Sequence, residues 1–340
     1  MSAMRRAADL RPFTTPLGRR LHFTPLGQGG VAVGAQFEPL DDAGAAAVMD
    51  AAWDAGLRYY DTAPLYGHGL SERRMGRALA GRPRDAFVLS TKVGRLLEPD
   101  ASARSGARVR FDYTRDAVLR SFDESLARLG LHKVDVLYVH DAELPTHRSA
   151  EVYEAHWNDL TYGGGWQALR ELRAAGVVDA IGLGVNDAAA CERMLAELDP
   201  DLFLLAGRYT LLEQAPLPGL MAHCQRRGVG VVIGGPFNSG VLVRPGGTFN
   251  YAAAPAEVLE RVERLRIACA RFSVPLPAAA LQLPAAHPAV VSVIPGGGSP
   301  AEVAANVAWF ETPIPDALWS ALKDEGLVDR AAPVPAAEGA

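Results

Sequence analysis

The residues best suited to chemistry in this sequence lie in the stretch YYDTAPLYGHGLSE, residues 59–72. Asp61 directly follows a short apolar run, Tyr66 comes five residues later, and Gly67 and Gly69 interrupt the chain before a helical pattern begins. This order is typical of a buried strand, a polar loop and a helix start, and parallel α/β proteins place their chemistry in such loops. A helix-capping aspartate and a packed loop tyrosine would give the same stretch, so its interpretation depends on the residues that accompany it.

A lysine and a histidine stand at the ends of two later apolar runs. Lys92 lies near the end of FVLSTKVG, residues 87–94, and His140 ends the apolar part of KVDVLYVHDAE, residues 133–143. Each of them alone also fits a structural role, a solvated strand end for Lys92 and a buried structural histidine for His140.

Together these side chains suit proton transfer coupled to hydride transfer at a carbonyl or alcohol carbon. An ammonium group near a tyrosine would lower its ordinary pKa of about 10, and an aspartate would hold the lysine in place. A histidine would donate a hydrogen bond to a substrate oxygen. If Tyr66 must lose its proton for an oxidation, we expect activity to rise with pH from neutral to alkaline conditions.

Composition narrows the class of protein. Of the 340 residues, 49% are hydrophobic and 21% charged, and the net charge of −5 argues against nucleic acid or an acidic membrane as a partner. The cysteines Cys191, Cys224 and Cys269 are far apart, so we expect free thiols, a reducing compartment and no metal site. No apolar run reaches the roughly 18 residues of a spanning helix, and the N-terminus lacks a signal-peptide pattern. We therefore expect a cytoplasmic protein.

Strand patterns alternate with helix patterns along the chain, which predicts a parallel sheet. Eight units favour a (β/α)8 TIM barrel of one domain, with a core of about residues 15–325 and an N-terminal β-hairpin at residues 12–25 that plugs one end. The polar segments 95–113 and 144–165 are predicted to be loops, the first a lid or a partly disordered connection. The tail at residues 331–340 is predicted to be disordered. The expected strands are 26–34, 57–60, 87–94, 133–143, 178–186, 201–209, 230–233 and 289–298, and the expected helices 41–56, 71–81, 114–130, 166–176, 187–198, 219–227, 254–272, 299–310 and 315–326.

These motifs resemble the aldo-keto reductase family over roughly residues 15–325. The resemblance is carried by YYDTAPLYGHGLSE, by Lys92 at a strand end and by VDVLYVHD. It implies that Tyr66 is the general acid/base and that Lys92, paired with Asp61, tunes it. By the same resemblance His140 orients the substrate carbonyl.

The family binds a nicotinamide dinucleotide without a Rossmann domain, in the loops after its seventh and eighth strands. GGPFNSGVL (234–242) and IPGGGSPAEVAAN (294–306) match these loops. Glycines there would let the backbone approach phosphate at a helix N-terminus. The resemblance implies cofactor contacts at Gly30, Asp61, Asn186, Gly234, Pro236, Phe237, Asn238, Gly240, Leu242, Pro295, Gly296, Gly297, Gly298, Glu302 and Asn306.

The second of these loops also indicates which dinucleotide is bound. Relatives that prefer NADPH carry Lys or Arg here, whereas Gly296, Gly298 and Glu302 stand at the matching positions and no cation lies within residues 294–306. A carboxylate at Glu302 would repel a 2′-phosphate and accept a hydrogen bond from a ribose hydroxyl. We expect NAD as the preferred cofactor, with NADP as the alternative.

The nicotinamide end departs from the family pattern. Four positions that hold the ring in the family carry other residues here, namely Gly184, Val185, Ala206 and Gly234. Asn186 would then supply the amide contact, and Tyr209 or Phe237 the aromatic surface.

The segments IGLGVN, AGRYTLLEQ and VVIGGPFNSGVL resemble one branch of the family, which contains L-fucose and D-threo-aldose 1-dehydrogenases, L-galactose dehydrogenases and pyridoxal 4-dehydrogenase. The resemblance implies oxidation of the hemiacetal carbon of an aldose, such as L-fucose or L-galactose, to a lactone. The alternatives are a pyridoxal dehydrogenase or general aldehyde reductase, and a catalytically idle subunit that senses nucleotide. We expect a small-molecule substrate bound by Tyr66, His140, Phe37 and Trp157, no nucleic-acid or membrane partner, and a monomer or weak homo-oligomer.

Overall fold

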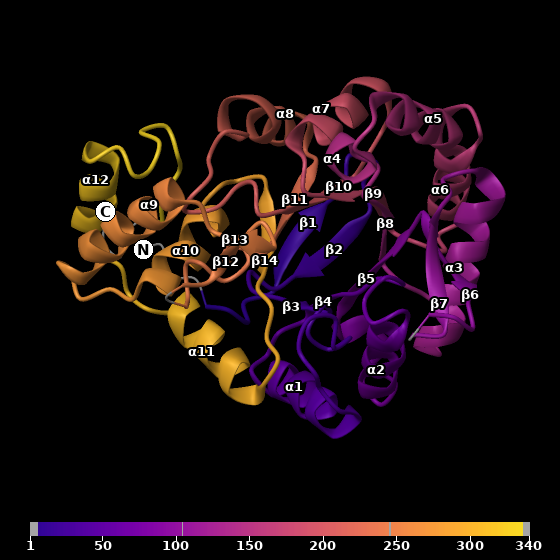
Figure 1. Ribbon diagram of the computed structural model, residues 1–340, viewed down its shortest axis with the longest axis horizontal. Coiled ribbons are helices and arrows are strands. Elements are labelled where there is room, and N and C mark those ends of the chain that lie inside the picture. The colour runs from indigo at the N-terminus through magenta and orange to yellow at the C-terminus, as the bar shows by residue number, and fades with distance from the viewer. Residues whose placement is uncertain (1–5, 104, 245, 336–340) are drawn as a thin grey trace.

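Eight parallel strands form one sheet in the spatial order β14-β11-β10-β9-β8-β5-β4-β3. The structure, a computed structural model, describes residues 6–103, 105–244 and 246–335. Leu26, just before β3, pairs with Val293 in β14, and this bridge closes the sheet into the expected (β/α)8 barrel (Figure 1). The barrel strands are β3 (Gln28–Gly29), β4 (Tyr59–Asp61), β5 (Val88–Val93), β8 (Val136–His140), β9 (Ala180–Val185), β10 (Leu202–Ala206), β11 (Gly230–Gly234) and β14 (Val290–Ile294).

Helices surround the barrel on its outer side (Figure 1). The apolar periodicity read from the sequence faces inward, as in α1, where Val48 and Ala52 are buried. Within the described ranges, no helix is both long and apolar enough to cross a lipid bilayer. The expected helices are α1 (Asp42–Asp54), α2 (Leu70–Leu79), α3 (Arg115–Leu129), α6 (Gly165–Ala174), α7 (Ala188–Glu197), α8 (Ala222–Arg227), α9 (Ala256–Ala270), α11 (Pro300–Phe310) and α12 (Asp316–Asp324).

The helix α10 (Leu276–Ala285) lies where no helix was predicted. Nearly all of its residues are buried, so it has no polar face and shows no helical periodicity. Pro284 within it also resembles a loop signal, although the proline is accommodated near the end of the helix.

The N-terminal hairpin, β1 (Arg11–Thr14) and β2 (Arg20–Phe23), fills the end of the barrel at which the strands begin. Phe23 is fully buried and meets the ring of Tyr59 edge-on, with 4.9 Å between centroids. Phe23 also belongs to a buried cluster with Val88 and Val136, the first residues of β5 and β8. The predicted plug is therefore present, and the hairpin lies across the middle of the ring of strands in Figure 1. The opposite end, where the strands finish, is left to the polar loops.

The segment 95–113, predicted as a loop, is an antiparallel hairpin of β6 (Arg95–Pro99) and β7 (Ala107–Phe111). Glu98 on β6 forms ion pairs with Arg108 and Arg110 on β7. This charged alternation hid the strand pattern in the sequence, because strands of this hairpin bury little apolar surface. A second small hairpin, β12 (Thr248–Phe249) and β13 (Ala252–Ala253), lies in the loop after β11.

The segment 144–165, also predicted as a loop, contains α4 (Leu144–His147) and α5 (Ala150–Thr161). In α5 only Trp157 and Leu160 are buried, so the apolar repeat is too sparse to recognise. Ser149 caps the helix by accepting a hydrogen bond from the amide of Val152.

The C-terminal tail is ordered further than predicted. Ala332 is buried in the main core and Val334 packs against it. The run of alanine and proline gave no sign of this, because its burial depends on contacts with distant elements. The remaining part of the predicted disorder, residues 336–340, lies outside the described residues.

If the N-terminal hairpin stabilises the barrel by filling its end, the stabilisation should depend on the buried ring of Phe23. Replacing Phe23 with alanine is expected to lower the free energy of unfolding by about 3–5 kcal/mol, because it opens a cavity in a closed barrel end. Leu17, at the hairpin turn and 63% exposed, is the matched control, and Leu17→Ala should change stability by less than about 0.5 kcal/mol. Urea denaturation measures both, and equal effects would contradict the plug.

Candidate active site

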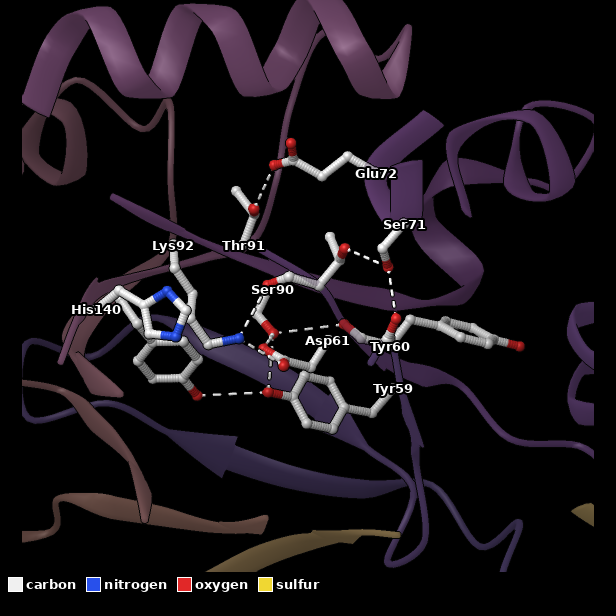
Figure 2. Close-up of polar contacts among 12 residues, drawn as sticks. Tyr59, Tyr60, Asp61, Ser71, Glu72, Ser90, Thr91, Lys92 and His140 are labelled. Carbon is white, nitrogen blue, oxygen red and sulfur yellow. Dashed lines mark hydrogen bonds and ion pairs between the residues drawn. The ribbon is translucent and has the colours of Figure 1, made fainter. Parts of the chain in front are cut away.

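A buried ion pair joins the ends of two neighbouring strands. The Nζ atom of Lys92 lies 2.6 Å from Oδ2 of Asp61 and donates a second hydrogen bond, of 2.9 Å, to the carbonyl of Thr62. Oδ1 of Asp61 accepts a hydrogen bond of 2.7 Å from Ser90. Figure 2 shows these side chains converging from β4 and β5, with His140 beside the lysine. Both charges are almost fully buried, so each depends on the other and on these polar contacts.

Strand register and one glycine make this pair possible. Ser90 and Lys92 are two residues apart on β5, and Ser90 lies directly opposite Asp61 in the register with β4. Alternation along a strand therefore points both β5 side chains to the same side. On β9, a Cβ atom added to Gly184 would lie 3.3 Å from Cε of Lys92, so the absent side chain leaves room for the lysine stem. The departure from the family pattern at Gly184 thus has a packing reason.

A layer of tyrosines supports the ion pair from below. The hydroxyl of Tyr59 lies 3.0 Å from Oγ of Ser90 (Figure 2). It also lies 3.4 Å from the hydroxyl of Tyr138. All three residues are fully buried within the barrel. The hydroxyls satisfy one another and so hold Ser90 in position to donate to Asp61.

Tyr66 stands above this layer, in the loop between β4 and α2. The Lys92 ammonium lies 4.7 Å from the centre of its ring, and the His140 ring meets it edge-on at 5.9 Å between centroids. A Cβ on Gly34 would come within 2.8 Å of the Tyr66 backbone, so the loops after β3 and β4 pack in close contact. The four predicted catalytic residues, Asp61 included, therefore meet at one place.

The acidity of Tyr66 differs from the expectation. Tyr66 is partly buried as a residue, and protein surrounds its phenol. This burial raises the pKa of Tyr66 well above its ordinary value, with the charges of Asp61 and Asp141 adding to the effect. The predicted lowering of the pKa by Lys92 is wrong for the free chain. The Lys92 ammonium is bound to Asp61 and faces the Tyr66 ring, so burial and the acidic neighbours determine the direction of the shift.

His140 is a neutral hydrogen-bond donor in this arrangement. Burial, with the nearby cations Lys92 and Arg95, lowers the pKa of His140 well below its ordinary value. Its Nε2 lies 3.4 Å from Oδ2 of Asp141, while Nδ1 is buried and, within the described part of the chain, has no hydrogen-bond partner. A neutral imidazole carries one N–H group, which here can serve a substrate oxygen.

The start of α11 is built to receive an anion, but a side chain already occupies it. Ser299 caps the helix by accepting from the amide of Glu302, and Oε2 of Glu302 accepts a hydrogen bond of 2.8 Å from the amide of Gly298. A Cβ on Gly296 would meet no atom within 4 Å, so the loop before the helix is open to a ligand. Glycine backbone and a helix N-terminus fit the adenosine end of a dinucleotide, and the Glu302 carboxylate already accepts from a backbone amide there.

A cation reaches this segment from another loop. Nη2 of Arg244, in the loop after β11, lies 3.0 Å from Oε1 of Glu302. Residues 294–306 contain no Lys or Arg, as expected, but the fold places the guanidinium of Arg244 beside them. This pair could not be predicted, because the two residues are 58 positions apart in the chain.

Several predicted cofactor residues serve the protein itself. Asn238 accepts from Thr210 and donates to the carbonyl of Gly207, and Asn306 donates to the carbonyl of Gly296. Gly30 lies beneath Asp61 and Ser71, with its carbonyl bound by the Ser71 hydroxyl. Each of these groups therefore has a structural hydrogen bond within the chain. The predicted residues that are wholly buried are Gly30, Asp61, Gly234, Pro236, Asn238, Leu242, Pro295, Gly297 and Asn306, and those at least partly exposed are Asn186, Phe237, Gly240, Gly296, Gly298 and Glu302.

The two aromatic candidates for the nicotinamide surface, Tyr209 and Phe237, differ in burial. Tyr209 is fully buried against His287, so it cannot form that surface. Phe237 is half-buried, with its ring edge-on to Trp309 of α11 at 6.1 Å. Phe237 therefore stays the aromatic candidate beside this loop.

The two aromatic residues predicted to bind substrate differ in exposure: Trp157 is buried and Phe37 is exposed. Trp157 is 1% exposed, donates a hydrogen bond of 2.7 Å to Glu197 and lies under the guanidinium of Arg193, so it packs α5 on α7. The prediction for Trp157 is wrong, because its loop is a helix. Phe37 is 67% exposed in the loop after β3 and meets the ring of Tyr251 at 5.8 Å between centroids.

Three charged residues at the strand ends around the four predicted catalytic residues were not predicted from the sequence. Arg95 begins β6, and its Nη2 lies 2.5 Å from Oδ2 of Asp141. Glu143 is buried, accepts from the amide of Asn186 at 2.7 Å and from Thr146 at 2.8 Å. Asp141 and Glu143 lie one and three residues after the strand-end histidine, so their place near it could be predicted. The pairing of Arg95 could not, because it depends on the β6–β7 hairpin.

Comparison with known proteins agrees with this geometry. Residues 25–325 match the model of the Aldo/keto reductase family. The chain is similar to pyridoxal 4-dehydrogenase of Microbacterium luteolum, 45% identical over 92% of this chain and 97% of that protein. It is also similar to D-threo-aldose 1-dehydrogenase of a Pseudomonas species, with 41% identity over 89% of this chain and 94% of that protein. Its fold matches a holo aldo-keto reductase of Bacillus halodurans, with a TM-score of 0.74 and 24% identity over 95% and 98% of the two chains. The branch indicated by the sequence motifs is thus confirmed.

Glu143 gives a stability prediction with a definite sign. Burial raises the pKa of Glu143 to about 7, with the charge of Asp141 adding to it, so the folded state favours the neutral acid. Stability from this group is full below the ordinary pKa of about 4.5 and is lost as the pH rises through about 7. Glu143→Gln keeps an acceptor for Asn186 and removes the charge.

At about pH 8 the Glu143→Gln variant should be more stable than the wild type by on the order of 1–3 kcal/mol, with the gain shrinking toward about pH 5. Thermal unfolding across this pH range measures the difference. Glu151→Gln, at an exposed position on α5, is the control and should show no trend with pH. A gain that is constant across the range would contradict the assignment.

Proposed function

Because the chain belongs to the aldo/keto reductase family, we propose that it oxidises the hemiacetal carbon of an aldose to a lactone by hydride transfer to NAD+. It is an NAD(P)-dependent oxidoreductase, in keeping with its dehydrogenase relatives. The observation that carries the proposal is the meeting of Tyr66, Lys92, Asp61 and His140 at the ends of β4, β5 and β8. The pyridoxal and aldose dehydrogenase relatives are named as enzymes, so they do not favour the alternative of a catalytically idle subunit.

Each side chain has a defined part in this oxidation. Tyr66, in its deprotonated form, takes the proton of the hemiacetal hydroxyl, and neutral His140 donates a hydrogen bond to the same oxygen as it becomes a carbonyl. The Lys92 ammonium, fixed by Asp61, faces the Tyr66 ring. When bound, NAD+ supplies the hydride acceptor. The loss of one proton and one hydride from the hemiacetal carbon and its hydroxyl gives the lactone.

The preference for NAD rests on the start of α11. The Glu302 carboxylate holds the Gly298 amide and pairs with Arg244. A 2′-phosphate would have to displace this carboxylate from a helix N-terminus and would meet its charge. A ribose hydroxyl could instead donate to it.

Pyridoxal is the second candidate substrate. The specific observation in its favour is that the pyridoxal 4-dehydrogenase relative is 45% identical to this chain, against 41% for the aldose dehydrogenase. Pyridoxal closes into an internal hemiacetal, so the same proton and hydride transfers would apply. The catalytic residues serve both substrates equally, and the choice between them lies in the loops around Phe37.

Domain organisation, oligomeric state and location complete the proposal. We propose one barrel domain, a monomer or weak homo-oligomer, and a cytoplasmic location. The three free cysteines, all buried, agree with a reducing compartment.

The proposed reaction is tested by following NADH formation with NAD+ or NADP+ and L-fucose, L-galactose, D-arabinose or pyridoxal. The methyl glycoside of each sugar is the matched control, because it keeps the ring but has no hydroxyl proton to lose. Turnover of a free sugar with NAD+, and none of its glycoside, is expected. Turnover of pyridoxal alone would replace the aldose by the second candidate, and turnover of neither with cofactor bound would overturn the proposal.

The cofactor preference is tested at Glu302. Glu302→Ala frees the Gly298 amide and leaves Arg244 unpaired, so the affinity for NADP+ should rise at least about tenfold relative to NAD+. Adding Arg244→Ala to this variant should remove most of the gain. Dissociation constants from quenching of protein fluorescence give the ratio. Glu257→Ala, which removes an acidic residue from the first turn of α9, is the control, and an unchanged ratio in Glu302→Ala would contradict the assignment.

A further inference from the structure

The β6–β7 hairpin brings an arginine to the rim of the active site. Gly94, with a φ of 97°, turns the chain between β5 and β6, and a Cβ there would collide with the ring of Tyr113 at 2.3 Å. The hydroxyl of Tyr113 donates to the carbonyl of His140 at 2.8 Å, which ties the base of the hairpin to the end of β8. Arg95, the next residue, is mostly buried, and its guanidinium lies 4.7 Å from the ring centre of Phe111. The arginine is therefore held in a fixed position.

Its partner Asp141 has an unusual backbone. Asp141 has a φ of 54°, in the left-handed region that few residues other than glycine adopt, and its amide donates to the carbonyl of Gly184 at 2.9 Å. This turn directly after β8 directs the carboxylate back toward the preceding histidine. Oδ2 lies 2.5 Å from Nη2 of Arg95 and 3.4 Å from Nε2 of His140. One carboxylate oxygen thus stands between the arginine and the histidine.

The same pair acts on Tyr66 with opposite signs. The charge of Asp141 raises the pKa of Tyr66, and the charge of Arg95 lowers it. Asp141 contacts both Arg95 and His140, and the His140 ring meets the Tyr66 ring at 5.9 Å between centroids. Neither charge belongs to the Asp61–Lys92 pair. The titratable and charged groups that surround Tyr66 are Asp61 from β4, Lys92 from β5, Arg95 from β6, His140 and Asp141 from the end of β8, and Tyr251 from the turn between β12 and β13.

We propose that Arg95 and Asp141 are positioning residues of the active site: Asp141 keeps the single proton of neutral His140 on Nε2, and Arg95 fixes Asp141 and balances its charge beside Tyr66. The buried, unpartnered Nδ1 of His140 agrees with this tautomer, because a protonated Nδ1 would be a buried donor without an acceptor among the described residues. The proposal rests on the proposed function only in giving His140 and Tyr66 an acid–base task. The charge arrangement itself is a property of the free chain.

The direct test is NMR of the protein without cofactor or substrate. Nitrogen shifts of labelled histidine report the tautomer of His140 at neutral pH, and tyrosine labelled at Cζ reports the titration of Tyr66, with Tyr66→Phe assigning the signal. The variants are Asp141→Asn, which tolerates the left-handed backbone, and Arg95→Gln. Arg108→Gln on the same hairpin, which breaks an exposed pair with Glu98, is the matched control.

The wild type should carry the proton of His140 on Nε2, and Asp141→Asn should move a measurable fraction of it to Nδ1. Tyr66 should titrate at lower pH in Asp141→Asn and at higher pH in Arg95→Gln, with no change in Arg108→Gln. A shift of one pKa unit is a tenfold change in proton affinity. Opposite shifts are the signature, because a purely structural disturbance would not change sign with the charge removed.

Three results would overturn the proposal: the proton of His140 on Nδ1 in the wild type, shifts of Tyr66 in the same direction in both variants, or no shift in either. If Asp141→Asn does not fold, the wild-type tautomer and Arg95→Gln still decide. None of these readouts involves a substrate, so a failed sugar assay leaves them unaffected and the two failures are distinguishable. In a working assay, the alkaline limb of kcat should move in the same sense as the Tyr66 titration.

Discussion

The arrangement of this barrel depends on the buried ion pair between Asp61 and Lys92. Removing two charges from water is costly, and their attraction offsets that cost only where further hydrogen bonds complete both groups. Here the carbonyl of Thr62 and the hydroxyl of Ser90 do so, at 2.9 and 2.7 Å. Removing one partner of such a pair typically costs about 3–5 kcal/mol, because it leaves the other charge buried and alone. The pair is thus a constraint on the fold as well as a part of the site.

Several features elsewhere in the chain can be understood as consequences of this pair. The N-terminal hairpin fills the barrel beneath it with Phe23 and keeps water from that end. Gly184 gives space to the lysine stem, and the register of β4 and β5 sets Ser90 opposite Asp61. Burial and the charge of Asp61 raise the pKa of the tyrosine above this pair, so the oxidation needs an opposing charge. That task passes to charges at the rim, where Arg95 acts against burial and against the acidic neighbours of the phenol.

The sequence was informative where function follows from position along a strand. Asp61, Lys92 and His140 could be predicted to meet because parallel strands end at one face, and no knowledge of packing was needed. The helix α10 could not be predicted, because burial on all sides removes the periodicity that reveals a helix. Trp157 was misassigned for the reverse reason, since a helix with few buried residues resembles a loop.

Interactions between distant loops were beyond sequence reasoning. Arg244 reaches Glu302 and Arg95 reaches Asp141 only because loops from different strands share one face of the barrel. Their charges decide the cofactor argument and the acidity of the site, although each residue alone looks like an ordinary surface arginine. The hydrogen bonds of Asn238 with Thr210 and Gly207 were likewise invisible in the motif, because both partners lie about 30 positions away in the chain.

The central claim is that the ion pair presents Tyr66 as the proton-transfer group of the reaction. The most direct measurement compares Tyr66→Phe with the wild type in two ways, by the rate of NADH formation with the best substrate and by the dissociation constant of NAD+. We expect the rate to fall by a factor of about 10²–10⁴, as for loss of a general acid/base, while NAD+ binding stays within about twofold. A variant that turns over at close to the wild-type rate would contradict the account.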